Sequence, residues 1–205
     1  MYYVVGLGNP GERYEGTRHN VGAAAVTALR EAVHLPAFHT SARFSGLIST
    51  GVWCEKEVTL LLPHTYMNKS GKAVRKLVAA DGSSATPATV LKRLIIVHDD
   101  IDLPLGTVRV VRGRGAGENN GVESIIQALG SKDFIRLRVG IAPTHWWSGE
   151  IQRPTGGGPL EKYVLQRFGP LERAKLPAIY AQCTQALELI VTRGVEAAMN
   201  ECNQS

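Results

Sequence analysis

The stretch Leu-Ile-Ile-Val-His-Asp-Asp, residues 94–100, decides the fold class of this chain. Its first four residues are continuously apolar, which is typical of a β-strand covered on both faces, as in the middle of an α/β sheet. We expect the strand to end in an acidic loop, His98 to Asp102. The segment therefore predicts a central strand with polar side chains just past its carboxyl end.

Working outward from this strand, apolar patterns of strand and helix type alternate along the chain. The expected strands are Tyr2 to Leu7, a hairpin of Phe44 to Trp53 with Val58 to Leu62, Thr107 to Arg112, and Arg136 to Ile141. The expected helices begin at Asn20, run from about Ser70 to Ala80 and from Val122 to Leu129, and cover Leu171 to Arg193, where Pro177 should bend or divide the helix.

This alternation predicts a single α/β domain, residues 1–205, with a twisted mixed central sheet and helices on both faces. Asn20 is a candidate N-cap for the first helix. Residues 81–89 are expected to form a surface loop, and residues 143–160, with Trp146 and Trp147, an unpacked loop insertion.

Composition limits the classes of protein to which the chain can belong. Its 205 residues contain 23 Lys and Arg against 18 Asp and Glu, a net charge of +5 that permits a polyanionic partner. Its apolar runs are far shorter than the roughly 20 residues of a membrane-spanning helix, so we expect no membrane partner.

The cysteines, Cys54, Cys183 and Cys202, are odd in number and widely spaced, which favours a reducing compartment. A strand that starts at Tyr2 leaves no room for a signal peptide, so we expect a cytoplasmic protein, with an organelle after processing as the alternative.

The loop after the first strand matches the dinucleotide fingerprint literally, as Gly6-x-Gly8-x-x-Gly11. That fingerprint requires a helix to begin within it, whereas Pro10 disfavours helical angles at the residue before it. The first convincing helix starts only at Asn20. The loop is therefore expected to present Asn9 at the carboxyl edge of the sheet.

His19 stands directly before that helix and is a candidate base. The positive end of the helix dipole disfavours an imidazolium there, so His19 is expected to stay neutral near pH 7. An exposed capping histidine is the alternative. Asp99 is a possible partner, and Asp99, Asp100 and Asp102 together are a weak candidate for a Mg²⁺ site. The chain contains neither a Walker pattern nor a Gly-x-Ser-x-Gly elbow.

Basic residues gather in two places. Lys69, Lys72 and Lys76 have the spacing of one helix face, and Arg109, Arg112 and Arg114 flank the Gly-rich loop of residues 113–121. A solvated helix face is the ordinary explanation for such a row. Two clusters beside asparagine-bearing loops favour contacts with a phosphate backbone.

Six motifs in order resemble the bacterial-type peptidyl-tRNA hydrolase family, from residue 2 to about residue 172. They are Val-Gly-Leu-Gly-Asn-Pro-Gly at residues 5–11 with Tyr14, Thr-Arg-His-Asn at 17–20, Tyr-Met-Asn-Lys-Ser-Gly at 66–71, His-Asp-Asp-Ile-Asp-Leu-Pro-Leu-Gly at 98–106, Asn-Gly at 120–121, and Arg-Leu-Arg-Val-Gly-Ile at 136–141.

The resemblance implies a monomeric enzyme that uses water to cleave the ester between a peptide and the 3′ ribose of tRNA, without a metal or other cofactor. It makes His19 the catalytic base, Asp99 its carboxylate partner and Asn9 a further catalytic residue. Among substrate-binding residues it implies Tyr14, Tyr66, Met67, Asn68 and Asn120. It associates Arg138 with the tRNA 5′ phosphate, while Val111 occupies the position of the second clamp residue, next to Arg112. With Lys69, Lys72 and Lys76, these two arginines form the expected RNA-binding set.

The chain departs from the family pattern in its Gly-rich loop. The family usually has Gly-His-Gly-Gly-His-Asn-Gly, whereas residues 115–121 read Gly-Ala-Gly-Glu-Asn-Asn-Gly. Ala116 and Asn119 thus replace two histidines, and Glu118 adds a negative charge near the expected RNA site. This loop leaves open the hypothesis of a non-catalytic RNA-binding relative of the intron-splicing type. A third hypothesis is a metal-dependent phosphoesterase that uses the acidic loop, His98 to Asp102.

Overall fold

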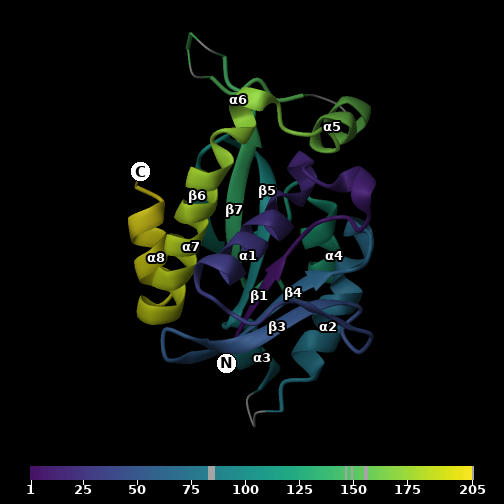
Figure 1. The fold of residues 1–205 in the computed structure, drawn as a ribbon, viewed down its shortest axis with the longest axis vertical. Coiled ribbons are helices and arrows are strands. Elements are labelled where there is room, and N and C mark those ends of the chain that lie inside the picture. The colour runs from purple at the N-terminus through teal and green to yellow at the C-terminus, as the bar shows by residue number, and fades with distance from the viewer. Residues whose placement is uncertain (83–85, 146, 149, 155–156, 205) are drawn as a thin grey trace.

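A seven-stranded mixed sheet forms the centre of the computed structural model, which describes residues 1–205 except 83–85, 146, 149, 155–156 and 205 (Figure 1). The strand order is β2-β3-β4-β1-β5-β7-β6. The neighbours β4, β1, β5 and β7 are parallel, and β2, β3 and β6 join antiparallel. The strands are β1 (Tyr2–Gly6), β2 (His39–Ser41), β3 (Gly46–Trp53), β4 (Lys56–Pro63), β5 (Leu94–Pro104), β6 (Val108–Arg112) and β7 (Ile135–Ala142).

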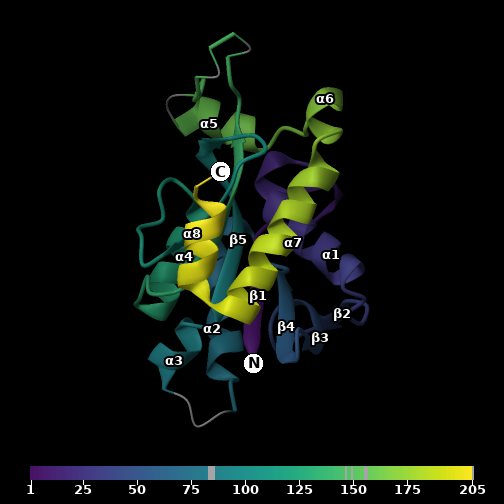
Figure 2. The same ribbon diagram turned by 90° about the vertical axis from the view of Figure 1, so that its left-hand side faces the viewer.

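Helices cover both faces of this sheet (Figure 2). One face carries α1 (Val21–Ala32), α7 (Leu176–Arg193) and α8 (Val195–Cys202), and the other α2 (Ser70–Ala79), α3 (Pro87–Leu91) and α4 (Asn120–Leu129). Two further helices, α5 (Gly157–Val164) and α6 (Pro170–Arg173), lie beyond one end of the strands. Short 3₁₀ turns are η1 (Glu12–Tyr14), η2 (Arg18–Asn20) and η3 (Met67–Lys69).

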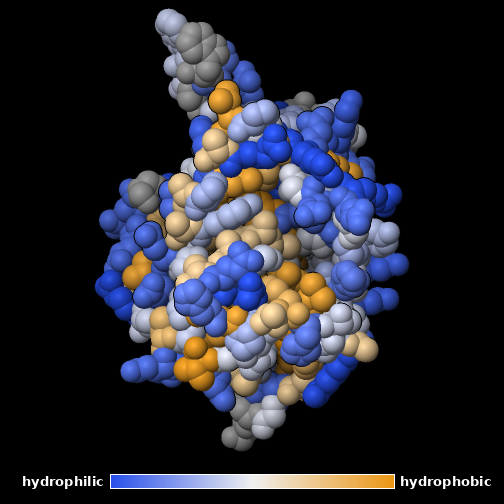
Figure 3. All heavy atoms as spheres, viewed as in Figure 1, coloured by the Kyte–Doolittle hydropathy of each residue, from blue (hydrophilic) through white to orange (hydrophobic). Residues whose placement is uncertain are grey.

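The central strands are apolar on both sides because each side faces a separate helical layer. Val4 and Ile95 join the core under α1 and α7, whereas Val5 and Ile96 join the core under α2 and α4, and all four are fully buried. At the surface, Figure 3 shows hydrophilic side chains around the rim of one face and paler, more apolar ones over α1 in its middle. The expected mixed α/β sheet with helices on both faces is confirmed.

The expected acidic loop at His98 to Asp102 is wrong, because β5 continues to Pro104. Pairing with β7 carries the strand onward, with Asp99 opposite Val139 and Asp100 opposite Gly140. The register then shifts before Pro104, and a Cβ on Gly140 would lie 2.1 Å from the Pro104 carbonyl oxygen. A glycine is therefore needed where the irregular strand passes so closely.

Helices lie in or beside three further segments for which the sequence made a prediction. Within residues 81–89, α3 begins at Pro87 after a Thr86 cap, while residues 83–85 lie outside the described part. The expected loop of residues 143–160 ends early, because α5 starts at Gly157 and packs Leu160 against the core; Trp146 lies outside the described residues. The predicted division at Pro177 is confirmed, since α6 and α7 are separate and Pro177 lies in the first turn of α7.

In the described part of the chain, no helix combines the length and apolar character that a membrane crossing requires.

Candidate active site

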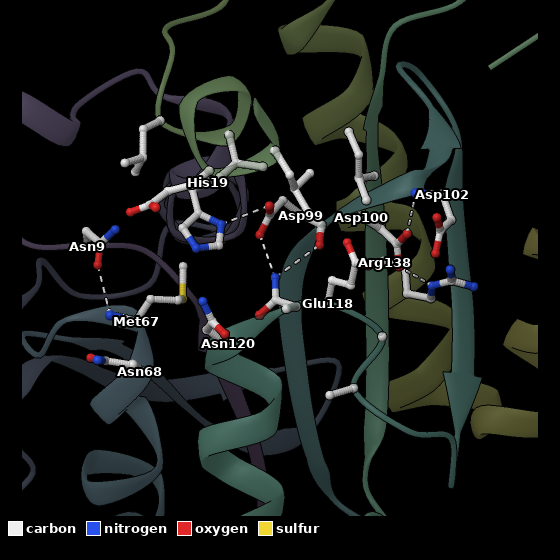
Figure 4. A pocket seen from close by; sticks show the side chains of 18 of the residues that line it. Asn9, His19, Met67, Asn68, Asp99, Asp100, Asp102, Glu118, Asn120 and Arg138 are labelled. Carbon is white, nitrogen blue, oxygen red and sulfur yellow. Dashed lines mark hydrogen bonds and ion pairs between the residues drawn. The ribbon is translucent and has the colours of Figure 1, made fainter. Parts of the chain in front are cut away.

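A cavity of about 930 Å³ opens where β1 and β5 end (Figure 4). The chain passes from β1 to β4 on one side and later returns to β5 on the other side of β1. The topology therefore reverses between β1 and β5, which is where open α/β sheets leave a crevice for a ligand. The cavity wall combines η1, η2, η3, the start of α4, the Gly-rich loop and α5.

His19 and Asp99 form a buried pair in this cavity. Their relative exposures are 8% and 4%, and His19 Nδ1 lies 2.9 Å from Asp99 Oδ2. A carboxylate can only accept here, so Nδ1 carries the proton of the neutral imidazole and Nε2 keeps its lone pair. The ring is thereby set up as a proton acceptor at Nε2.

The protonation preference of His19 differs from the one expected. Burial lowers the pKa of His19, but the charge of Asp99 and its hydrogen bond raise it by more, so the net pKa lies above the ordinary 6.5. The pKa of His19 therefore shifts in the direction opposite to the one that the helix dipole alone predicts. A full negative charge in contact with the ring outweighs a partial charge spread over a helix end.

Asn9 is held on both its backbone and its side chain. The Asn20 amide accepts from Asn9 N at 2.8 Å and donates to Asn9 O at 2.9 Å. Asn20 occupies the N-cap position of α1 but makes no capping hydrogen bond, because its amide serves Asn9 instead. Asn9 Oδ1 accepts from Met67 N at 2.8 Å, which turns Asn9 Nδ2 away from Met67, on the side of His19 (Figure 4).

Asn68 and Asn120 complete a set of three asparagines on the cavity wall. Both side chains are exposed, and neither has a hydrogen-bond partner among the described residues. Their segments can approach because Gly121 follows Asn120: a Cβ there would lie 2.5 Å from Met67 Sδ. The structure thus brings Asn9, Asn68 and Asn120 to the same cavity as His19 (Figure 4).

Two tyrosines of the predicted site also line the cavity. The rings of Tyr14 and Tyr66 meet edge to face with centroids 6.3 Å apart, and the Arg13 guanidinium lies 4.4 Å from the Tyr14 centroid. Tyr66 is 50% exposed, whereas Met67 beside it is only 4% exposed. The pair therefore offers an accessible aromatic edge next to a packed methionine.

The carboxylates of β5 do not converge on one point. Asp99 contacts His19, Asp100 contacts Arg138, and Asp102 contacts Arg153 at 2.8 Å. Within the described ranges there is no group of three or more His, Cys, Asp or Glu side chains that could hold a metal ion. The geometry does not fit the hypothesis of a Mg²⁺ site on Asp99, Asp100 and Asp102.

The predicted basic residues fall in different places. Arg138 and Lys69 line the cavity, whereas Lys72 and Lys76 are exposed outside it, and Lys76 Nζ donates to Ser45 Oγ at 2.8 Å. Arg112, also of the expected RNA-binding set, is not part of the cavity wall, and its guanidinium is held by both oxygens of Asp133, at 2.9 and 3.1 Å.

Two further arginines line the cavity near Arg138: Arg114, from the basic cluster beside the Gly-rich loop, and Arg136, which was not predicted as an RNA-binding residue. Arg136 is 4% exposed, and its pKa is lowered to about 10 by burial and then by the charges of Arg138 and Arg114. The alternation of residues 136–141 contains the signal for Arg136, because it places Arg136 on the same strand face as Arg138. No local pattern could have shown that Arg114 faces them.

Glu118 is paired rather than free. Its carboxylate lies 2.5 Å from Arg153 Nη2, and Arg153 also contacts Asp102. Glu118 belongs to the loop that departs from the family pattern, and Arg153 belongs to the expected insertion of residues 143–160. The ion pair therefore neutralises the negative charge that Glu118 introduces.

Comparison with known proteins agrees with this geometry. The family model described as peptidyl-tRNA hydrolase matches residues 3–205. The chain belongs to the peptidyl-tRNA hydrolase family. It is therefore a hydrolase, and the resemblance drawn from its motifs is confirmed and extends to the C-terminus.

Similar members of the family come from several bacteria. A peptidyl-tRNA hydrolase from Roseiflexus castenholzii is 42% identical over 203 residues, covering 99% of this chain and 87% of its own. One from Mycobacterium tuberculosis is 39% identical over 198 residues, with 96% and 94% covered. A crystal structure of the peptidyl-tRNA hydrolase from Acinetobacter baumannii has a TM-score of 0.84 and 29% identity, and covers 99% of this chain and 94% of its own.

Proposed function

We propose that this hydrolase cleaves the ester between the peptide and the 3′ ribose of peptidyl-tRNA with a water molecule activated by His19. The single observation that carries the proposal is the orientation of His19, whose Nδ1 is held by Asp99 while Nε2 is left as an acceptor. A base with a fixed tautomer beside a large cavity is what hydrolysis by water requires.

The proposed reaction has two steps. His19 Nε2 takes one proton from water as the water oxygen bonds to the ester carbonyl carbon, which forms a tetrahedral oxyanion. The carbon–oxygen bond to the ribose then breaks, and the imidazolium returns the proton to the ribose O3′. The products are a tRNA with a free 3′ hydroxyl and a peptide with a free carboxylic acid, which releases its proton to solvent and becomes a carboxylate. His19 is regenerated, and no step calls for a metal.

Neutral donors suit the developing oxyanion. Asn9 Nδ2 faces away from Met67, and the Asn68 and Asn120 amides are exposed on the same wall. Amide N–H groups stabilise an oxyanion without titrating, so their contribution does not vary with pH. We assign Asn9 to the reaction itself, and assign Asn68, Asn120, Tyr14 and Tyr66, with Met67, to holding the substrate.

The RNA part of the substrate is assigned to the basic wall of the cavity. Arg138 and Lys69 of the predicted set, together with Arg114 and Arg136, supply cations there. Lys72 and Lys76 continue this charge along α2. Since one chain supplies every residue in this description, we also propose that the protein is a monomer. We propose that it acts in the cytoplasm, where its substrate is made.

Hydrolysis of a defined peptidyl-tRNA, with and without a chelator, tests the proposal. We expect rapid cleavage that the chelator does not slow, loss of turnover in His19→Ala, and a smaller loss in Asp99→Asn, which weakens orientation of the base without removing it. His39→Ala, which removes an exposed histidine of β2, serves as the matched control. Binding of tRNA without cleavage would instead support the RNA-binding alternative, and chelator-sensitive cleavage of other esters the phosphoesterase.

A further inference from the structure

The carboxamide of Asn119 forms hydrogen bonds at both its ends, through Nδ2 to Asp99 and through Oδ1 to the first turn of α4. Its Nδ2 donates to Asp99 Oδ1 at 2.7 Å and lies 3.3 Å from the Asp99 carbonyl oxygen. Its Oδ1 accepts from Gly121 N at 3.0 Å and Val122 N at 3.1 Å, and so caps α4. Asn119 is 9% exposed and belongs to the loop that departs from the family pattern.

We infer that Asn119 is a positioning residue for the hydrolytic reaction, acting through Asp99; this inference rests on the proposed function of His19. One oxygen of Asp99 faces His19 (Figure 4), and the other accepts from Asn119 Nδ2, so the carboxylate is held from both sides. The carboxylate that the imidazolium contacts during the reaction therefore keeps one orientation.

The orientation of the Asn119 amide is itself determined by the helix. The first N–H groups of α4 have no partner within the helix and require an acceptor. Asn119 Oδ1 meets that need, so the other end of the amide must present N–H groups toward Asp99. The N-terminus of α4 therefore sets the geometry of the Asp99–His19 pair, and it does so at any physiological pH because an amide does not titrate.

The alternative is that Asn119 only caps α4, and two variants separate the roles. In Asn119→Asp the carboxylate still accepts from Gly121 and Val122, but it has no N–H for Asp99 and adds a like charge against it. In Asn119→Ser the hydroxyl still caps the helix, but it is too short to reach Asp99. Thr86→Ala, which removes the cap of α3 far from the site, is the matched control for loss of a helix cap.

Steady-state kinetics on peptidyl-tRNA from pH 5 to 9 provide the test. We expect kcat to fall about tenfold in both Asn119 variants, with KM unchanged within about twofold. In Asn119→Asp the acidic limb of kcat should also move to higher pH, because the added carboxylate stabilises the His19 imidazolium. Thr86→Ala should keep the kcat and the pH profile of the wild type.

Wild-type kcat and an unmoved acidic limb in both Asn119 variants would overturn the inference. So would a fall in melting temperature with wild-type kinetics, because it would leave only the capping role. Wild type and His19→Ala, measured in the same assay, isolate the proposed function: if wild type does not cleave, or if His19→Ala does, the proposed function fails. If those two behave as expected, wild-type kinetics of the Asn119 variants overturn only the role of Asn119.

Discussion

His98 and Asp99 are neighbours in β5, and both are buried, but the environment acts on them differently. Asp99 shares its carboxylate oxygens with His19 and Asn119, whereas His98 Nδ1 lies 2.7 Å from the Asp99 carbonyl oxygen and His98 Nε2 has no hydrogen-bond partner within the described structure. Burial, followed by the charge of Arg136, lowers the pKa of His98 to about 4. His98 is therefore a neutral, structural histidine one residue away from the proposed catalytic carboxylate.

The lowered pKa of His98 predicts a loss of stability in acid. The unfolded chain binds a proton at this side chain near pH 6.5, but the folded protein does so only near pH 4, so the free energy of unfolding falls as the pH drops through this window. His98→Asn, which keeps an N–H donor but does not titrate, should remove a loss of up to about 3 kcal/mol. Urea unfolding at pH 7 and pH 4.5 measures it, with His39→Asn as the exposed control. Equal acid sensitivity in wild type and His98→Asn would contradict the assignment.

The pKa of His19 predicts the pH dependence of the rate. Because the pKa is raised above 6.5, the acidic limb of kcat/KM should lie above pH 6.5 in the wild type. In Asp99→Asn the raising influences disappear and burial remains, so the limb should move to lower pH while the rate falls. Rates on peptidyl-tRNA from pH 5 to 9 give the acidic limb of the wild type and of Asp99→Asn. If the limb of Asp99→Asn lies at the same pH as in the wild type, or at a higher pH, Asp99 does not control the pKa of His19.

At the scale of elements, the site depends on close crossings that only glycine permits. A Cβ on Gly22 would lie 2.2 Å from the Val97 carbonyl oxygen, where α1 crosses β5. A Cβ on Gly71 would lie 2.1 Å from the Ser124 carbonyl oxygen, where α2 crosses α4. These two contacts set the distances between the segments that carry His19, Asn68 and Asn120.

Gly71→Ala should therefore disturb both stability and substrate binding. The methyl group must push α2 away from α4, and overpacking of this kind costs about 1–3 kcal/mol of unfolding free energy. KM should rise because Asn68 and Asn120 move apart. Denaturant unfolding and steady-state kinetics report the two effects. Gly82→Ala, where a Cβ meets none of the described residues within 4 Å, should change neither, and wild-type stability of Gly71→Ala would show that the helices can separate freely.

Arg18 connects the turn that carries His19 to α5, to α6 and to the segment between them. Its guanidinium contacts both carboxylate oxygens of Glu172 at 2.9 and 2.7 Å, donates to the Arg167 carbonyl at 3.2 Å, and lies 4.3 Å from the Tyr163 ring centroid. Arg18→Lys keeps the charge, but its single nitrogen cannot replace Nη2 at Glu172 and Nη1 at the Arg167 carbonyl together, and it has no planar group to stack on Tyr163. We expect it to lower the unfolding free energy by about 2 kcal/mol, measured by denaturant unfolding. We also expect it to lower kcat, measured by hydrolysis of peptidyl-tRNA. Arg193→Lys, at an exposed pair with Glu201, is the control, and equal effects would refute a special role for Arg18.

At the scale of the whole molecule, the distribution of cations matters more than the net charge of +5. We expect tRNA binding by the inactive His19→Ala protein to weaken with salt, and Lys69→Gln or Arg114→Gln to reduce the slope of log K against log salt by about one. Both residues line the cavity, whereas Arg112 is held by Asp133 outside it. Arg112→Gln should leave the slope unchanged. A series of Kd values between low and physiological salt decides this, and an equal effect of Arg112→Gln would place the RNA elsewhere.

The sequence alone was sufficient for the α/β sheet, because the apolar runs at Tyr2 to Leu7 and Leu94 to Val97 must be covered on both faces, and the period of the intervening segments is helical. It was also sufficient for the candidate residues His19, Asp99 and Asn9. Polar side chains that follow parallel strands or precede the next helix collect at the carboxyl edge of the sheet by topology, without any knowledge of contacts.

Only the tertiary structure decided the features that depend on pairs far apart in the chain. β5 runs through the acidic residues because β7 pairs with them, and the pKa of His19 rises because Asp99, 80 positions away, contacts its ring. Asn119 has an ordinary loop sequence around it, and its hydrogen bond to Asp99 exists only because α4 begins beside β5. Local propensity determines which residues form an element, whereas charge and hydrogen bonding act through space, so the partners of a side chain follow from the packing of elements and not from their order.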